Sequence, residues 1–406
     1  MLSNASILKE KGLHNRGNKL LHKAKKLAIE CENFNILLEI YDLILPELSR
    51  KEGLKIIHEK GRVLKKLENL LAYREINFDM NFGKTKVARQ KSAKQRLKLP
   101  LLQKEELALS TRAKGLFHHI KSVCFFLIDD PKKSLEHLVK RKNHLDSSPE
   151  FLKVNLSSYF SCINNSMVTY TSLEQYEKVN GLLDELSLKL DDKRSFTPNI
   201  RSKIFRIYVI EKLDLLIKFG HFKEAIPFLS KIEQRIDQYK NQLSVFRLSI
   251  IYTNISIIYF GLNNYKTALT WINKALDLPK GFDEIDFIVF TKLFNIIIHY
   301  ELGNNELVLH LERSFNRYNK QIGRTFEAEI VLIKFFRITI PKIDNNEEKI
   351  AAFKKLKSEL IEIFKAPQET KLLNYFDFIS WIESKMQNRS FGEIIKEKLA
   401  NNSKKN

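Results

Sequence analysis

Glycine, proline and cysteine are all scarce in this sequence of 406 residues. It has 13 glycines and 9 prolines, well below their average usage of about 7% and 5%. These residues form most tight turns, and all-β proteins need many turns, so the scarcity favours long helices with short connections. The three cysteines, Cys31, Cys124 and Cys162, are far apart and form no CxxC pair. This predicts three reduced thiols in a cytosolic protein.

The sequence motifs of several enzyme classes are missing as well. No GxxxxGK[ST] phosphate loop, GxGxxG fingerprint, GxSxG nucleophile elbow or HExxH zinc helix occurs. The adjacent His118 and His119 would point about 100° apart on a helix. His137 and His144 lie two turns apart, too far for one metal ion without a third ligand from elsewhere. We therefore predict a protein that is not an enzyme, with no catalytic residue, no metal site and no cofactor.

Long apolar runs are also absent. No stretch approaches about 18 uninterrupted apolar residues, the length that indicates a membrane-spanning helix, and the segment from Met1 to Gly12 lacks the apolar core of a secretion signal. Hydrophobic residues still make up 44% of the chain, which is enough to bury a large core. We expect a cytoplasmic protein with no membrane partner.

Positive charge is in excess and is unevenly distributed. The net charge is +21, and residues 1–100 hold 22 Lys and Arg against 11 Asp and Glu. A dense basic block attracts polyanions by counterion release, although it can also be a solvated connection without a ligand. The candidate polyanion-binding residues are Lys84, Lys86, Arg89, Lys91, Lys94, Arg96 and Lys98.

The apolar spacing is helical nearly throughout the chain. From Leu243 to Phe260, apolar residues cover most of the helix circumference, which predicts a helix buried on several sides. The helical patterns end at Gly and Asn residues, for example at 261–264 and 303–305, and these residues tolerate the left-handed conformation that closes a helix. Loops this short make the flanking helices antiparallel neighbours.

A unit of two helices recurs along the sequence. A long apolar helix and a tight turn precede an amphipathic helix with a small or short residue in its first turn. A single compact core stops growing at about 250–300 residues, so a chain of this length forms several domains or one elongated array. A repeat period of about 20–50 residues indicates the array, a solenoid. The small or short positions are 40 to 46 residues apart: Ser134, Val179, Ala225, Ala268, Val308 and Ala352.

Residues 249–280 resemble the tetratricopeptide repeat. Ser256 and Ala268 occupy its small positions, where two helices approach closely, and large residues fill the space around them. A second copy at 206–237 keeps part of the motif but has Lys212 and Leu213 at the usual Leu-Gly. The matching residues are Tyr252, Ile255, Tyr259, Tyr265, Ile272, Ala275 and, one place early, Pro279 in the first copy, and Gly220, Phe222, Ala225 and Leu229 in the second. The resemblance implies an all-α protein, a right-handed α-solenoid of about seven to eight antiparallel helical hairpins.

The expected organisation has three parts. Residues 1–100 form divergent helical hairpins with a basic connection at 81–99, residues 101–400 form the solenoid, and residues 401–406 form a disordered tail. The stretch from Ile7 to Ala28 is typical of the second half of a hairpin whose first helix is missing or degenerate. This predicts an N-terminal edge that is exposed or covered by another chain. The segments Leu64–Leu71, Leu109–Lys114 and Tyr375–Lys385 also resemble uncharacterised tetratricopeptide-like proteins of Bacteroidetes bacteria.

The resemblance implies a scaffold that presents a concave groove to a peptide or a helix of a partner protein. Nucleic acid at the basic stretch is the alternative partner. Asn254 occupies the place where peptide-binding members of the family have a clamping asparagine, and aromatic residues from Tyr375 to Trp381 are expected to cap the last hairpin. The groove residues are His119, Asn164, Asn165, Ile207, Ile210, Glu211, Asp214, Ile250, Thr253, Asn254, Ile257, Leu293, Ile297 and Tyr300.

Overall fold

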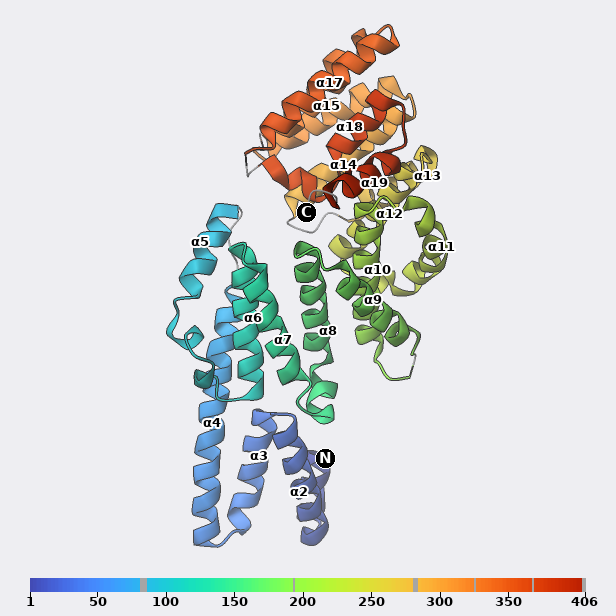
Figure 1. Cartoon of the computed structure of the whole chain (residues 1–406). Coiled ribbons are helices and arrows are strands. Elements are labelled where there is room, and N and C mark those ends of the chain that lie inside the picture. The colour runs from blue at the N-terminus through green and yellow to red at the C-terminus, as the bar shows by residue number, and fades with distance from the viewer. Residues whose placement is uncertain (81–85, 193, 280–283, 325, 367–368, 404–406) are drawn as a thin grey trace. The chain divides into compact units, whose positions relative to one another are not determined.

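The computed structural model describes residues 1–406 except 81–85, 193, 280–283, 325, 367–368 and 404–406. The described residues form nineteen α-helices and short 3-10 or π segments, with no β-strand among them. Consecutive helices pack in pairs joined by short turns (Figure 1). This confirms the predicted all-α fold of stacked helical hairpins. By their internal contacts the residues form two units, Met1–Asp184 and Glu185–Asn406, which we describe separately.

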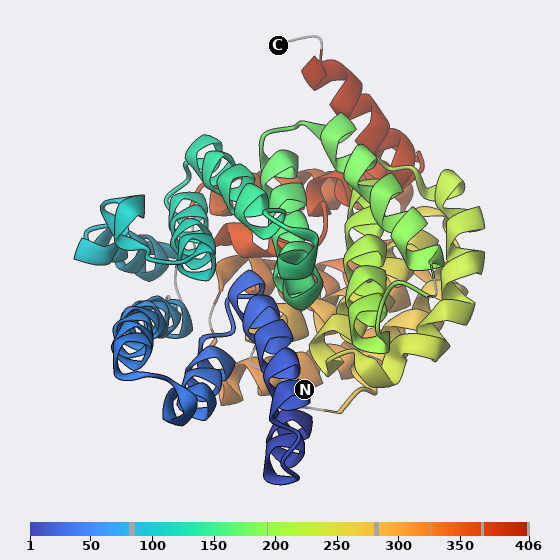
Figure 2. The same cartoon turned by 90° about the horizontal axis from the view of Figure 1, so that it is seen from below.

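The first unit contains the N-terminal helices and a continuous core. Its helices are α1 (Leu2–Glu10), α2 (His14–Glu30), α3 (Phe34–Ile44), α4 (Arg50–Phe78), α5 (Lys86–Arg96), α6 (Thr111–Leu127), α7 (Pro131–Leu145), α8 (Pro149–Ser172) and most of α9 (Tyr176–Asp191). Helices α2, α3 and α4 lie side by side (Figure 2). One hydrophobic cluster runs from Ala24 to Cys124 and includes α3, α4, α5 and α6, so it crosses residue 100. The domain boundary expected at residue 100 was based on how regular the repeats are on either side, and it stays a prediction.

The first hairpin is complete, which corrects one expectation from the sequence. Helix α1 has nine residues and packs against α2, so the helix expected to be missing or degenerate is present and short. The two helices meet at Gly17, where an added Cβ would lie 3.1 Å from the carbonyl oxygen of Ala5. Gly17 therefore allows the close backbone approach that a larger residue would prevent.

The basic stretch is also more ordered than a simple connection. Residues Lys86–Arg96 form helix α5, and Ala93 on this helix is fully buried in the core of the first unit. Arg96 donates hydrogen bonds to the Ile76 carbonyl and to the backbone and side chain of Asp79, at the end of α4. The expected connection at 81–99 is therefore wrong for residues 86–96.

The second unit repeats the hairpin pattern. Its helices are α10 (Pro198–Lys218), α11 (Phe222–Tyr239), α12 (Val245–Gly261), α13 (Tyr265–Leu276), α14 (Ile285–Glu301), α15 (Asn305–Gln321), α16 (Glu327–Lys334), α17 (Asn346–Ile363), α18 (Phe378–Gln387) and α19 (Phe391–Ser403). In the helical pair α12–α13, the buried Ser256 hydroxyl donates to the Ala268 carbonyl at 2.7 Å. Two helices can exchange such a bond only when they are in close contact, as the motif predicts.

Five of the six small or short residues that mark the predicted repeat are buried at helix contacts, as expected. Ser134, Val179, Ala225, Ala268 and Val308 are all buried. Ala352 is only half-buried, and the adjacent Phe353 is fully buried in its place. The last position is therefore wrong by one residue. The reason is that α17 packs against the aromatic residues of α18 rather than against another repeat of the same kind.

The C-terminal aromatic residues do more than cap the last hairpin. Trp381 is fully buried and contacts Phe336 and Phe353 there. Phe391 reaches further back, where it stacks on Phe222 of α11 and meets Phe260 of α12 edge-on. The segment from Leu372 to Ile395 therefore ties several hairpins of the second unit together.

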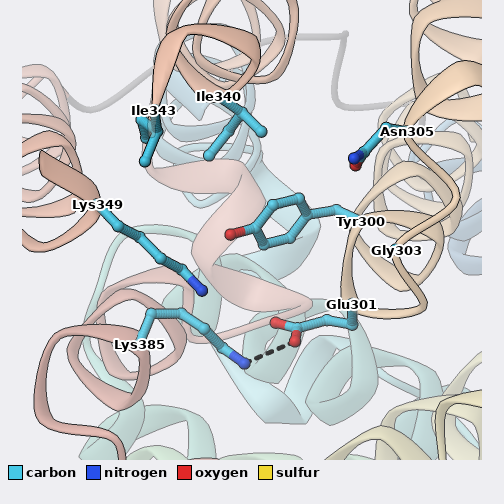
Figure 3. Close-up of a pocket in the computed structure, with 8 residues that line it drawn as sticks. All are labelled: Tyr300, Glu301, Gly303, Asn305, Ile340, Ile343, Lys349 and Lys385. Carbon is cyan, nitrogen blue, oxygen red and sulfur yellow. Dashed lines mark hydrogen bonds and ion pairs between the residues drawn. The ribbon is translucent and has the colours of Figure 1, made fainter. Parts of the chain in front are cut away.

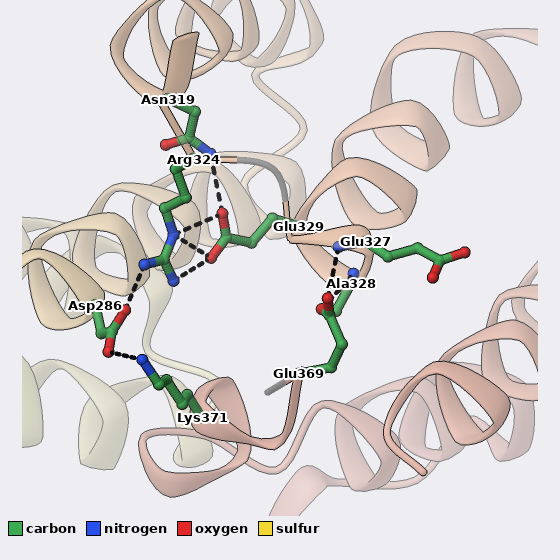
Figure 4. Close-up of polar contacts among 8 residues, drawn as sticks. All are labelled: Asp286, Asn319, Arg324, Glu327, Ala328, Glu329, Glu369 and Lys371. Atoms are coloured by element: carbon green, nitrogen blue, oxygen red, sulfur yellow. Dashed lines mark hydrogen bonds and ion pairs between the residues drawn. The ribbon is translucent and has the colours of Figure 1, made fainter. Parts of the chain in front are cut away.

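A polar network fixes the start of α16 within the second unit (Figure 4). The Arg324 guanidinium donates to Glu329, at 2.6 Å from Nη2 to Oε1, and to Asp286. Lys371 also pairs with Asp286, at 2.8 Å. The Glu369 carboxylate accepts hydrogen bonds from two backbone N–H groups in the first turn of α16, those of residues 327 and 328, at 3.1 Å each. These N–H groups have no partner within the helix, so a distant side chain serves as the cap.

A second distant cap occurs in the first unit. The Glu32 carboxylate accepts hydrogen bonds from the backbone N–H groups of Thr111 and Arg112, at 2.7 Å each, at the start of α6. A carboxylate there also interacts favourably with the positive end of the helix dipole.

None of the described helices is both long enough and apolar enough to cross a lipid bilayer.

Candidate functional site

The strongest group of expected groove residues lies on α10 and α12. Asn254 donates a hydrogen bond from its side-chain amide to the Asp214 carboxylate, at 2.6 Å. Glu211 lies one turn before Asp214 on the same helix, so the two carboxyl groups share one helix face. The structure thus brings Glu211, Asp214 and Asn254 together, and we call them the polar row.

The environment of the polar row disfavours negative charge. Burial, with a smaller contribution from Asp214, raises the pKa of Glu211 to about 8, against the opposing effect of Arg206 and Arg247. Burial also raises the pKa of Asp214 to about 6, although the hydrogen bond from Asn254 acts in the other direction. Glu211 is therefore mostly protonated at neutral pH. Such shifts concentrate at functional sites, although structural clusters produce them too.

Water still reaches the polar row. Asp214 is exposed, Glu211 is half-buried and Asn254 is buried, so the two carboxyl groups of the row are accessible from outside but the amide is not. Within the described part of the chain, no Lys or Arg lies within ion-pair distance of either carboxyl group. The two carboxyl groups are therefore an accessible acidic site without an ion-paired Lys or Arg, although the charges of Arg206 and Arg247 attract Glu211.

Most of the apolar groove candidates are not accessible. These side chains pack between helices of the second unit, and a ligand could contact them only if the helices separated. Ile250 is half-buried, on the helix that carries Asn254. The buried apolar candidates are Ile207, Ile210, Ile257, Leu293 and Ile297, and the polar candidate Thr253 is buried as well.

Tyr300 lies at a separate pocket of the second unit, with a volume of about 360 Å³ (Figure 3). The neighbouring Glu301 carboxylate accepts from the Trp381 indole at 2.7 Å and pairs with Lys385 at 2.6 Å. Lys349 also lines the pocket and forms no ion pair with any described residue. Burial and the charge of Glu301 raise the pKa of Tyr300, so its hydroxyl stays protonated and can donate a hydrogen bond.

The three groove candidates of the first unit do not form one site. The Nδ1 atom of His119 accepts a hydrogen bond from Arg141, at 3.1 Å. Asn165 lines a pocket of about 220 Å³ between α6, α7 and α8, and His119 is not among the lining residues. Asn164 is half-buried on α8. They belong to a different unit from the polar row.

The candidate polyanion-binding residues have different surroundings. Arg96 is held by Asp79, and its side chain is 12% exposed, so it is not available for a ligand. Lys84 lies outside the described residues, as does the side chain of Lys86. The exposed members are Arg89, Lys91, Lys94 and Lys98.

The structure also assembles a histidine cluster that the sequence did not indicate. Glu105, in the short 3-10 helix Glu105–Leu107, lies 3.1 Å from Nε2 of His118 and 3.1 Å from Nε2 of His144. On the far side of the His118 ring, Nδ1 lies 2.8 Å from Nδ1 of His137. The structure thus places His144 with Glu105 and His118 from two other elements, while His137 contacts only the far side of the His118 ring. The only signal in the sequence was the presence of three histidines in two successive helices. It does not show which residues of the two helices lie opposite each other.

Comparison with known proteins gives little further identification. No known protein-family model matches the sequence, and no curated protein is detectably similar to it. Among solved structures, the chain is similar to NprR in its complex with the cognate peptide NprX, with 16% sequence identity, a TM-score of 0.41, and coverage of 86% of this chain and 98% of that chain. A likeness at this level assigns neither a family nor a ligand, and the resemblance to Bacteroidetes proteins stays an expectation.

Proposed function

We propose that this chain is a non-enzymatic scaffold that binds an extended peptide segment of a partner protein at the polar row. The observation that carries the proposal is the accessible carboxyl pair Glu211 and Asp214, which lacks a cationic partner and has raised pKa values. A folded protein gains no stability from such a pair. A ligand that supplies a positive charge would remove the unfavourable interaction.

The chemistry of the row favours a basic peptide. A Lys or Arg side chain would pair with the two carboxylates, while the buried Asn254 amide holds Asp214 in position through its hydrogen bond. Both groups lie on helices fixed by hairpin packing, so the protein loses little conformational freedom on binding. Two carboxyl groups bind such a side chain without any covalent step. The three buried, unpaired cysteines fit a reducing compartment, such as a bacterial cytoplasm.

Selection of peptides from a random display library on the intact chain tests the proposal. We expect selected peptides to share a Lys or Arg and to bind at least tenfold more weakly to the Asp214→Asn and Asn254→Ala variants. Glu306→Gln, at an exposed carboxylate on α15, is the matched control and should bind like the wild type. Equal affinity of the selected peptides for the wild type and Asp214→Asn would refute the site.

Proton release provides an independent measurement. A cationic ligand lowers the pKa of the carboxyl groups that it contacts, so protons must leave Glu211 when the complex forms at pH 7. Calorimetry in two buffers with different ionisation enthalpies measures this number directly. We expect net release for the wild type and much less for Glu211→Gln.

Polyanion binding at helix α5 is the second candidate function. Lys91, Lys94 and Lys98 are exposed; Lys91 and Lys94 lie three residues apart on one face of α5, and Lys98 follows in the turn after the helix. The affinity of this stretch for a DNA or RNA duplex should fall steeply as the salt concentration rises. Replacing the three lysines by Gln should reduce the slope of log affinity against log salt by about 2–3. Three lysines of the first unit outside this stretch, Lys19, Lys23 and Lys51, are exposed controls.

A further inference from the structure

We propose that Glu105, His118 and His144 form a binding site for a divalent transition-metal ion, for which zinc is the best fit. The three side chains come from three elements of the first unit: the 3-10 helix Glu105–Leu107, α6 and the last turn of α7. One ligand atom from each lies within 4.8 Å of the other two. No catalytic role is part of the proposal.

The separations between the ligand atoms come close to those of a metal site. Zinc binds imidazole nitrogen and carboxylate oxygen at about 2.0–2.2 Å in tetrahedral geometry, which places neighbouring ligand atoms about 3.3–3.5 Å apart. One Glu105 carboxylate oxygen, Oε2, lies 3.1 Å from Nε2 of His118, and the other, Oε1, lies 3.1 Å from Nε2 of His144. Small side-chain rotations would therefore admit an ion between the three groups. Two imidazoles and one carboxylate form a ligand set that zinc commonly uses.

The state of His118 is the second observation that points to an ion. Its side chain is 1% exposed, and its Nε2 atom has no hydrogen bond of acceptable geometry although Glu105 is close. A buried nitrogen without such a bond is costly. The Nδ1 atom contacts Nδ1 of His137 at 2.8 Å, and one of these two nitrogens must donate. With the proton on Nδ1 of His118, the Nε2 lone pair is directed into the cluster and is free to bind a metal.

His137 would then orient the ligand from outside the site. Metal-binding histidines usually bond their second ring nitrogen to a neighbouring group, which fixes the tautomer and the ring. The His137 ring stacks on Phe125, with centroids 5.4 Å apart and an angle of 7° between the planes. This contact holds His137 in place for the bond to His118.

Access and charge set how an ion would bind. The side chains of Glu105 and His144 are 29% and 25% exposed, so an ion can enter from solvent. Three protein ligands leave a fourth position for water. Lys114, Lys121 and Lys140 lie near the cluster and weaken cation binding.

Titration of the chelator-treated full chain with zinc sulfate, followed by calorimetry, tests the site. We expect one equivalent of zinc to bind with an affinity that His144→Ala and Glu105→Gln each reduce at least tenfold. These two residues are partly exposed, so the variants should fold, and circular dichroism checks this. His137→Ala should reduce affinity less, and His58→Ala, at an exposed histidine on α4, should have no effect.

Cobalt substitution reports the geometry separately. Co²⁺ bound by two imidazoles, a carboxylate and water should give the intense visible absorption of a tetrahedral complex, and His144→Ala should remove it. The proposal is overturned if no stoichiometric zinc binds. It is equally overturned if the His144→Ala and Glu105→Gln variants bind zinc and cobalt as the wild type does, because the ions would then occupy other histidines.

Discussion

Removing the Arg324 guanidinium should destabilise the second unit more than removing any surface cation. Arg324 is the cation that holds Glu329, whose side chain is 1% exposed, and its own side chain is 8% exposed. Arg324→Met would leave the Glu329 carboxylate buried and without its guanidinium partner. Breaking a buried ion pair in this way costs about 3–5 kcal/mol, because the remaining charge is not solvated. Asp286 would keep its contact with Lys371, so the loss comes mainly from Glu329.

The expected change is large enough to measure by thermal unfolding. The second unit has about 220 residues, and for domains of that size each kcal/mol lowers Tm by about 2–4 °C. We therefore expect a fall of about 6–20 °C in the transition of this unit. Hydrogen exchange of the α14 and α16 amides assigns the transition, since a chain with two units need not unfold in one step.

Two further variants separate the buried charge from general disruption. Arg324→Met/Glu329→Gln removes both charges and should recover a large part of the loss. Arg389→Met breaks an ion pair with Glu397 in which both side chains are at least 40% exposed, so it should cost less than about 1 kcal/mol. A loss below about 1 kcal/mol for Arg324→Met, or no recovery in the double variant, would refute the reasoning.

Three other predictions concern single positions. Glu369→Gln removes the charged cap of α16 and should cost about 0.5–2 kcal/mol in urea unfolding, with faster amide exchange confined to the start of that helix. Gly220→Ala should lower the free energy of unfolding more than Gly303→Ala. Both glycines have positive φ, but only at Gly220 would the added Cβ lie 2.8 Å from the Gly392 carbonyl oxygen. Equal losses for the two variants would contradict this contact. Glu211→Gln should change the pH dependence of stability. The folded pKa of about 8 lies above the usual 4.5, so the wild type loses stability as pH rises from about 4.5 to about 8. The variant should gain about 1–3 kcal/mol over the wild type at pH 9 and little at pH 4, and an equal gain at both pH values would contradict the assigned pKa.

Features that depend on residues close in sequence were predictable. Helix positions follow from apolar periodicity, and turns follow from residues that adopt positive φ, such as Gly220, Asn263 and Gly303. The contact of Ser256 with Ala268 joins the two helices of one hairpin and was anticipated from a small-residue motif. Glu211 and Asp214 share a helix face, and Asn254 occupies the matching position of the next repeat, so their proximity also followed from the register.

Features that join distant elements were not predictable. The Glu32 and Glu369 caps act on helices about 80 and 40 residues away in the sequence, and a Glu in a turn carries no mark of such a role. The burial of Leu293 and Ile297 depends on which neighbours cover α14, and a helix that is apolar all round does not show which face stays open. The contact of Phe391 with Phe222 was unpredictable for the same reason, because the sequence does not show which helix a distant segment will cover.

The sequence by itself determined that this chain forms α-helical hairpins, because the helical period, the small contact residues and the turn residues act within about 40 positions of one another. Only the tertiary structure decided which side chains are accessible and which charged or metal-binding groups meet. Those outcomes depend on the rotation and offset of each helix against helices that are remote in sequence, to within a few ångströms. Side-chain packing sets that offset, and no local pattern records it.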